Sequence, residues 1–402
     1  MWIWDDGLRL NLARFAKGGC LKQRIAIADF RWVLPGELDW EDLLAGRSAV
    51  VSLPEHFPVS VAAPCPIEPE VPADWQKGLF PRAVGLAHEA LQRLGPKKMD
   101  RVGLVLGLPN YFAEVPYLEH VLPHGDQPEE MAWVGGFYAD AALDFLAKRI
   151  PNCGPRVRLD SACATGNDCL AVAHQWLSTG FVSNCVVVAA SAMVTPTGLA
   201  LFKNLKALSL SKSLQASCPF DRRRNGFVMG EGAAAFWLTT DTKWHPRGFL
   251  EGYGMRLQAA NFIDLPEDLA PMAEACQEAL GENDEVAYVS AHGTATQLND
   301  LRETQLHRHL FGERAQEIPM SSVKSMLGHT LGAAALIDAG VCVSALEAGM
   351  APPTINLHEP DPECDLNYLP LQAQPIHGDL ALSNAFAFGG QNTSVLIRGT
   401  RG

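Results

Sequence analysis

One cysteine of the chain, Cys163, stands where a thiol can act as a nucleophile. It lies in the sequence Ser-Ala-Cys-Ala-Thr-Gly (161–166), between a predicted strand and a predicted Ala-rich helix. A thiol at a helix N-terminus feels the positive end of the helix dipole, which favours the thiolate. A small buried structural thiol is the alternative. That alternative is our interpretation of four other cysteines: Cys169, Cys185, Cys276 and Cys342.

Two histidines and a lysine occupy comparable positions in the second half of the chain. His292 follows a predicted apolar strand, at the carboxyl end where α/β enzymes place functional groups. His329 begins a predicted long helix, and Lys324 precedes it by five residues. Each histidine taken alone is typical of a structural residue. Together with Lys324 and Cys163 at equivalent turns, they predict one converging site for nucleophilic catalysis.

A glycine turn near the C-terminus completes the candidate chemistry. The segment 384–392 joins Phe386 and Phe388 to the pair Gly389-Gly390. Paired glycines permit a close backbone approach and can aim amides at a developing oxyanion. The alternative is that this segment is only a glycine turn next to phenylalanines of the core.

The elements that must position these residues alternate between strands and helices. Continuous apolar runs at 102–106 and 185–190 predict central strands covered on both faces, with a shorter strand at 24–28. Helical patterns at 82–94 and 139–148 lie between them. This order predicts an α/β fold.

The second half repeats the pattern after a break near residues 239–247. It has an apolar strand at 286–290 and a long helix of small residues at about 332–349. Both 161–166 and 321–329 read as a strand end, a polar turn and a buried helix. We therefore expect two duplicated halves, 1–240 and 241–402, with one shared site between them.

Composition limits the classes of function. The 402 residues are 48% hydrophobic, which suffices for a large core. The scattered cysteines are typical of reduced thiols, and neither a signal peptide nor an apolar run of about 18 residues is evident. We expect a cytoplasmic protein without membrane contact.

The net charge of −13 argues against nucleic acid as a binding partner. Positive charge nevertheless gathers locally at Lys203, Lys206, Lys212 and 222–224.

Five sequence blocks resemble those of the elongating beta-ketoacyl-acyl-carrier-protein synthases of the thiolase-like superfamily. They lie at 162–166, 219–232, 291–296, 324–329 and 386–392. The resemblance covers roughly residues 25 to 400. It implies a thiolase-like α/β fold, in which two duplicated αβα halves form a five-layered αβαβα core.

The resemblance also implies roles for individual residues. Cys163 is the acylated nucleophile, His292 and His329 serve decarboxylation and carbanion stabilisation, and Lys324 orders the histidines electrostatically. The amides of Cys163 and Phe388 form the oxyanion hole. We further expect Thr294 and Thr296 to bind the pantetheine arm, and Glu303 and Asp338 to be supporting acids. The expected acyl pocket and gate consist of Phe202, Asn110, Tyr111, Phe112, Phe386 and Phe388. The expected carrier-protein patch consists of Lys203, Lys206, Lys212 and Arg223.

The implied activity is a decarboxylative Claisen condensation between a Cys-bound acyl group and malonyl on acyl carrier protein. No metal or redox cofactor is expected. The partners would be the carrier protein and a second subunit, identical or ketosynthase-like. Two alternatives stay open: a thiolase-type acyltransferase, which usually has a second cysteine near the C-terminus, and a noncatalytic chain-length subunit, which generally lacks the nucleophile.

Three departures from the family pattern affect specificity. Residues 107–112 replace a glycine-rich stretch beside the acyl tunnel, Ala387 replaces a usual glycine of the gate, and Asp338 stands where a glutamate commonly pairs with the lysine. Acyl chain length and pathway (fatty acid, polyketide or polyene) therefore stay open. Residues 1–23 match no part of the family.

Overall fold

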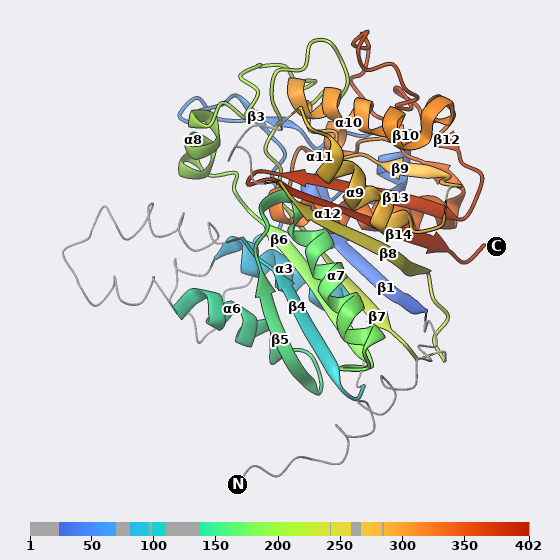
Figure 1. Cartoon of the computed structure of the whole chain (residues 1–402). Helices are drawn as coiled ribbons and strands as arrows, with labels where there is room; N and C mark the ends of the chain where they lie inside the picture. The colour runs from blue at the N-terminus through green and yellow to red at the C-terminus, as the bar shows by residue number, and fades with distance from the viewer. Residues whose placement is uncertain are drawn as a thin grey trace.

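The computed structural model describes residues 24–69, 81–95, 99–109, 137–241, 243–258, 267–283 and 285–401. Its main feature is a ten-stranded sheet with the order β10-β9-β13-β14-β8-β1-β7-β6-β4-β5 (Figure 1). The strands are β1 Ile25–Val33, β4 Val102–Gly107, β5 Cys153–Leu159, β6 Asn184–Ser191, β7 Gly232–Thr239, β8 Gly248–Leu257, β9 Tyr288–Ser290, β10 Met320–Ser321, β13 Leu380–Ala387 and β14 Gln391–Gly399.

The two halves of this sheet have the same topology. Numbered along the chain within each half, the strands run 3-2-4-5-1 both in β5-β4-β6-β7-β1 and in β10-β9-β13-β14-β8. In each half the first two pairings are parallel and the last two antiparallel. The halves join where β1 pairs with β8 over three residues. The predicted duplication is therefore confirmed, while the exact boundary at residue 240, between β7 and β8, stays a prediction.

Helices form three layers around the two half-sheets. Helices α7 (Thr165–Ser178) and α12 (Ala334–Ala348) lie in the middle, because each contacts strands of both halves. Helix α3 (Arg82–Leu94) covers the outer face of the first half, and α9 (Ala270–Leu280) with α10 (Gln297–Phe311) covers that of the second (Figure 1). The result is the expected five-layered αβαβα core.

The predicted elements are present, with shifts at their ends. Helix α3 has the predicted bounds, and α6 (Phe137–Ala147) begins two residues earlier than predicted. Strand β1 continues to Val33 because it pairs along β7, while β9 begins only at Tyr288. The ends of these strands are set by pairing with neighbouring strands. The local sequence does not show where that pairing stops.

Helix α12 is apolar on all sides because both of its faces are covered. Its residues from Ala334 to Leu346 are all buried. With the preceding turn, the stretch Leu331–Ala348 is long and apolar enough to cross a membrane by composition, so the expectation that no run reaches that length is wrong. Most of this stretch is buried between the half-sheets, as befits the central helix of a globular core.

The two central helices cross at very close range. A Cβ added to Gly166 of α7 would overlap the backbone nitrogen of Leu336 of α12 and lie 2.9 Å from its Cα. Only a glycine permits this approach. The crossing brings the N-terminal ends of α7 and α12 together.

We therefore expect Gly166→Ala to destabilise the protein by about 1–3 kcal/mol, because the added methyl forces the central helices apart. Urea unfolding followed by circular dichroism measures the change. Gly154→Ala is the matched control, since its Cβ would meet only the carbonyl of Val102 at 3.7 Å. Equal unfolding midpoints for the two variants would contradict this account of the crossing.

Candidate active site

Cys163 lies in a tight turn at the start of α7. The turn is a 3-10 helix, η4 (Ala162–Ala164), whose first residue has a left-handed φ of 50°. The hydroxyl of Thr165 stabilises it by accepting from the Ser161 amide (2.8 Å) and donating to the Ala162 carbonyl (2.7 Å). The residue Cys163 is 5% exposed. Its position at the end of β5 and the beginning of α7 is the predicted one.

The second half builds the same turn beside His329. Here a 3-10 helix, η6 (Leu331–Ala333), precedes α12, and Leu331 has a φ of 48°. The Leu331 amide donates to Nδ1 of His329 (3.3 Å). Because Nδ1 accepts this bond, the neutral imidazole carries its proton on Nε2. That nitrogen lies 3.1 Å from Sγ of Cys163.

His292 lies next to His329 and is held through its backbone. Its ring centroid is 5.4 Å from that of His329, edge to face. The carboxylate of Glu303, on α10, accepts from the amides of His292 and Gly293, both at 2.8 Å. Nδ1 of His292 is buried and has no hydrogen-bond partner among the described residues. Glu303 thus positions the loop that carries the imidazole.

A buried ion pair lies beneath the histidines. Nζ of Lys324, in the short helix α11 (Lys324–Leu327), is 2.6 Å from Oδ2 of Asp338 in α12. Both side chains are almost fully buried. The aspartate therefore makes the pairing for which the family commonly uses a glutamate.

Burial and the Lys324 charge together set the protonation states of the site. Burial lowers the pKa of His292 and of His329 well below 6.5, and the nearby Lys324 lowers both further. Both imidazoles are therefore neutral at physiological pH. Burial also raises the pKa of Glu303 to about 7, although the hydrogen bonds from the amides of His292 and Gly293 lower it.

The pKa of the Cys163 thiol differs from the expectation that its place at a helix N-terminus favours the thiolate. Burial raises the pKa of Cys163 to about 12, and Lys324 is the largest influence in the opposite direction. Desolvation therefore outweighs the helix N-terminus in the free site. The Nε2 proton of His329 supplies the local donor that a thiolate needs.

A cavity of about 670 Å³ leads from these residues to the surface. Cys163, His292 and His329 line its buried end, whereas the exposed Lys206 and Gln297 line its outer part. Thr294 and Thr296 lie between, with their hydroxyls 2.9 Å apart. A long, narrow substrate arm fits such a graded path from solvent to thiol.

The aromatic residues divide between the cavity wall and the packing behind it. Phe386 and Phe388 line the cavity, as predicted. Phe202, in α8 (Pro196–Asn204), packs edge to face on Phe227 at 6.0 Å, one layer away from the lining. Phe227 itself packs on His329 at 5.0 Å and was not predicted, although it belongs to the block 219–232. The predicted pocket residues Asn110, Tyr111 and Phe112 lie outside the described residues.

The gate turn explains why alanine is tolerated at position 387. Ala387 is the last residue of β13 and pairs with Gln391 of β14. The left-handed conformations fall on Gly389 (φ 81°) and Gly390 (φ 77°). The missing glycine therefore costs no backbone strain.

The predicted cationic patch is only partly available. Lys206 and Lys212 are exposed, and Nζ of Lys203 donates to the Pro58 carbonyl (2.8 Å). Arg223 binds the carboxylate of Asp221 with two nitrogens, at 2.7 and 2.8 Å. Arg223 thus has a structural partner that the sequence did not indicate.

Two family models match the chain on either side of the β7–β8 connection. Residues 83–243 match the beta-ketoacyl synthase N-terminal domain, and residues 250–358 match the beta-ketoacyl synthase C-terminal domain. The tetracenomycin polyketide synthase ketoacyl synthase alpha subunit of Streptomyces glaucescens is 32% identical, over 92% of this chain and 88% of that protein. The chain belongs to the beta-ketoacyl synthase family.

Further relatives include another curated synthase and two solved ketosynthase structures. A 3-oxoacyl-[acyl-carrier-protein] synthase 2 of Synechocystis is 37% identical over 65% of each chain. The solved ishigamide ketosynthase/chain length factor superposes with a TM-score of 0.82 at 27% identity, covering 95% of this chain and all of that one. A type II polyketide ketosynthase structure, solved with its acyl carrier protein and a hexaketide, superposes with a TM-score of 0.81 at 25% identity, covering 94% and 100%.

The buried lysine offers a direct test of the electrostatics in this ketosynthase site. We expect Lys324→Met to raise the pKa of Cys163 further, because the cation that favours the thiolate is gone. Alkylation of Cys163 should then be about tenfold slower at a given alkaline pH, the change that one pKa unit produces. Peptide mass spectrometry of iodoacetamide-treated protein across pH measures it, with the exposed Lys243→Met as control. A pH profile that moves to lower pH would contradict the assignment.

Proposed function

We propose that this protein is an active, decarboxylating beta-ketoacyl synthase that uses Cys163 as its nucleophile. The observation that carries the proposal is the 3.1 Å contact between Sγ of Cys163 and Nε2 of His329, inside a buried cavity shared with a second neutral imidazole. Fold alone does not decide between active and inactive members, so the proposal rests on this site.

The first step loads the acyl group. The Cys163 thiol gives up its proton, its sulfur attacks the thioester carbonyl of an acyl carrier, and the carrier sulfur leaves and takes up a proton as the carrier thiol, so that an acyl-enzyme thioester remains. Burial raises the pKa of Cys163 to about 12, so the site favours neutral forms, the thiol before acylation and the thioester after it. Lys324 is the largest influence that favours the thiolate formed in between.

The second step removes carbon dioxide from malonyl on the carrier. The electrons of the broken carbon–carbon bond pass into the thioester, whose oxygen becomes an enolate. Nε2 of His329 carries a hydrogen that can stabilise this oxygen, and His292 lines the same cavity. Because burial and Lys324 keep the pKa of both imidazoles well below 6.5, each donates a hydrogen bond without supplying a second proton that would quench the carbanion.

The third step joins the two groups. The enolate carbon attacks the carbonyl of the acyl-Cys163 thioester, and the Cys163 thiolate leaves to regenerate the enzyme. We assign the intermediate oxyanion to the amides of Cys163 and Phe388, whose residues both line the cavity. These three reaction steps need neither a metal nor a redox cofactor. The substrates arrive on the phosphopantetheine arm of the carrier. Thr294 and Thr296 stand along its path.

The complete site distinguishes this proposal from its alternatives. A chain-length subunit generally lacks the nucleophile, whereas Cys163, His292, Lys324 and His329 all converge here. A thiolase-type enzyme would need a second cysteine near the C-terminus, and the last cysteine of this chain, Cys364, is buried away from the cavity lining.

The two half-reactions provide the decisive test. We expect Cys163→Ser to lose acyl loading by several orders of magnitude, because a serine hydroxyl is a far weaker nucleophile. His329→Ala should retain measurable loading and release carbon dioxide from malonyl carrier about 10²–10³ times more slowly. Intact-mass loading and carbon dioxide release measure the two steps separately. Wild-type carbon dioxide release by His329→Ala would refute the role proposed for it.

We further propose that the carrier protein docks beside the cavity mouth. Four leucines of α8 and the following loop are 38–62% exposed and alternate with lysines: Leu201, Lys203, Leu205, Lys206, Leu210, Lys212 and Leu214. Leu205 and Lys206 also line the cavity. Apolar contacts ringed by positive charge suit an acidic carrier, which the overall charge of −13 would otherwise repel.

Charge reversal at Lys206 should therefore weaken use of acyl carrier protein and reduce its salt dependence, while sparing a small acyl thioester. Loading rates with the two substrates, at low and high salt, give the comparison. The control is Lys243→Glu, an exposed lysine outside this surface. Equal losses on both substrates would point to a damaged fold instead.

A dimer is the third element of the proposal. In the described part of the chain, β5 pairs with β4 alone and ends the ten-stranded sheet. Its free edge can pair with another subunit, identical or ketosynthase-like. The ishigamide structure is that of a ketosynthase and chain length factor. A cytoplasmic location stays a prediction.

A further inference from the structure

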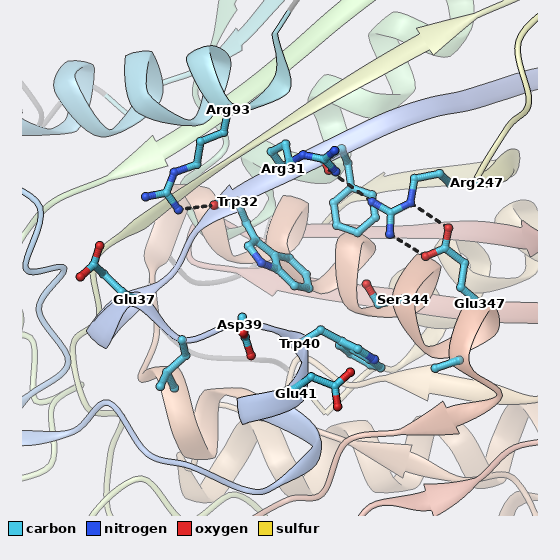
Figure 2. Close-up of a pocket in the computed structure, with 13 residues that line it drawn as sticks. Arg31, Trp32, Glu37, Asp39, Trp40, Glu41, Arg93, Arg247, Ser344 and Glu347 are labelled. Atoms are coloured by element: carbon cyan, nitrogen blue, oxygen red, sulfur yellow. Dashed lines mark hydrogen bonds and ion pairs between the residues drawn. The ribbon is translucent and has the colours of Figure 1, made fainter.

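A second pocket, of about 530 Å³, lies at the end of α12 that is remote from Cys163. It is lined by β1, by the start of α2 (Trp40–Leu44) and the turn before it, and by the last turn of α12 (Figure 2). The fifteen residues of α12 separate it from the catalytic turn by about 20 Å. None of its lining residues has a part in the chemistry above.

Two indoles form the aromatic part of this pocket. Trp32 reaches it from β1 and Trp40 from α2, and both are half-buried (Figure 2). The neighbouring Phe30 ring is already occupied, because the Arg247 guanidinium lies over it at 4.2 Å. No cation lies over either indole among the residues that the structure describes. Both indoles line the pocket without a resident cation in the described part of the chain.

The charges around the pocket leave an excess of carboxylate. Its three arginines are all paired: Arg31 with Asp29, Arg93 with Glu89, and Arg247 with Glu347 through two hydrogen bonds. In contrast, no described residue forms an ion pair with its three remaining acids, Glu37, Asp39 and Glu41. Asp39 instead caps α2 by accepting from the Asp42 amide. The pocket therefore favours a cation.

A hydroxyl from an otherwise buried residue faces the same space. Ser344, in α12, is only 5% exposed, and no hydrogen bond joins its side chain to any described residue. Figure 2 shows it on the pocket wall, across from the two tryptophans. A serine in a helix usually bonds back to a carbonyl of the preceding turn, so an unpaired buried one is a polar group that lacks its partner.

We propose that this pocket binds a small organic cation, an amine or quaternary ammonium with a compact apolar body. The indoles of Trp32 and Trp40 supply cation–π contacts and the unpaired carboxylates supply the charge. Ser344 supplies one hydrogen bond. The volume is that of a small-molecule site.

Titration calorimetry with benzyltrimethylammonium tests the proposal on the full-length protein. Benzenesulfonate, an anion of similar size, and neutral benzyl alcohol are the comparison ligands. We expect binding of the cation and none of the anion, with affinity that falls as salt is added. Absence of binding at millimolar cation, or equal binding of the sulfonate, would overturn the proposal.

Variants assign the binding to this pocket instead of the catalytic cavity. Trp40→Leu should weaken cation binding about 2- to 30-fold, the range of one cation–π contact, whereas Trp244→Leu should not change it. Glu41→Gln should weaken it as well, with the exposed Glu313→Gln as its control. If Trp40→Leu fails to fold, Glu41→Gln decides alone. Wild-type affinity in Glu41→Gln and in any folded Trp40→Leu would exclude this site.

Discussion

The close crossing of α7 and α12 is the constraint on which the site depends. Each half-sheet delivers one helix to the middle layer, and each helix begins with a turn whose first residue is left-handed. Gly166 lets the two helices approach until its own backbone lies against the backbone of Leu336. Only at that distance does the thiol of one half come within 3.1 Å of the imidazole of the other. Catalysis is thus a property of the duplicated architecture, because neither half holds a complete site.

Burial gives this site its chemical character, at a cost in stability. A buried lysine and aspartate are expensive to desolvate, and an ion pair of this kind is weak support for a fold. The Lys324–Asp338 pair has a clear electrostatic consequence instead, since the lysine lowers the pKa of Cys163, His292 and His329 together. A single buried charge therefore favours both the thiolate of Cys163 and the neutral forms of His292 and His329.

Backbone geometry contributes as much as the side chains. The Leu331 amide selects the His329 tautomer, and the Glu303 carboxylate holds the amides of His292 and Gly293. The gate turn places its left-handed conformations on Gly389 and Gly390, so its preceding residue is free to be alanine. These backbone contacts fix the positions of the imidazoles and of the turn beside them.

The sequence by itself determined the α/β class, the duplication and the identity of the four central residues. Continuous apolar runs report strands covered on both faces, and residue types at strand ends report chemistry, because both are local patterns. It did not determine that burial raises the pKa of Cys163, that Phe227 packs on His329, or that Arg223 is held by Asp221. Those properties depend on desolvation and on contacts between segments far apart in the chain. Only the packed tertiary structure sets them.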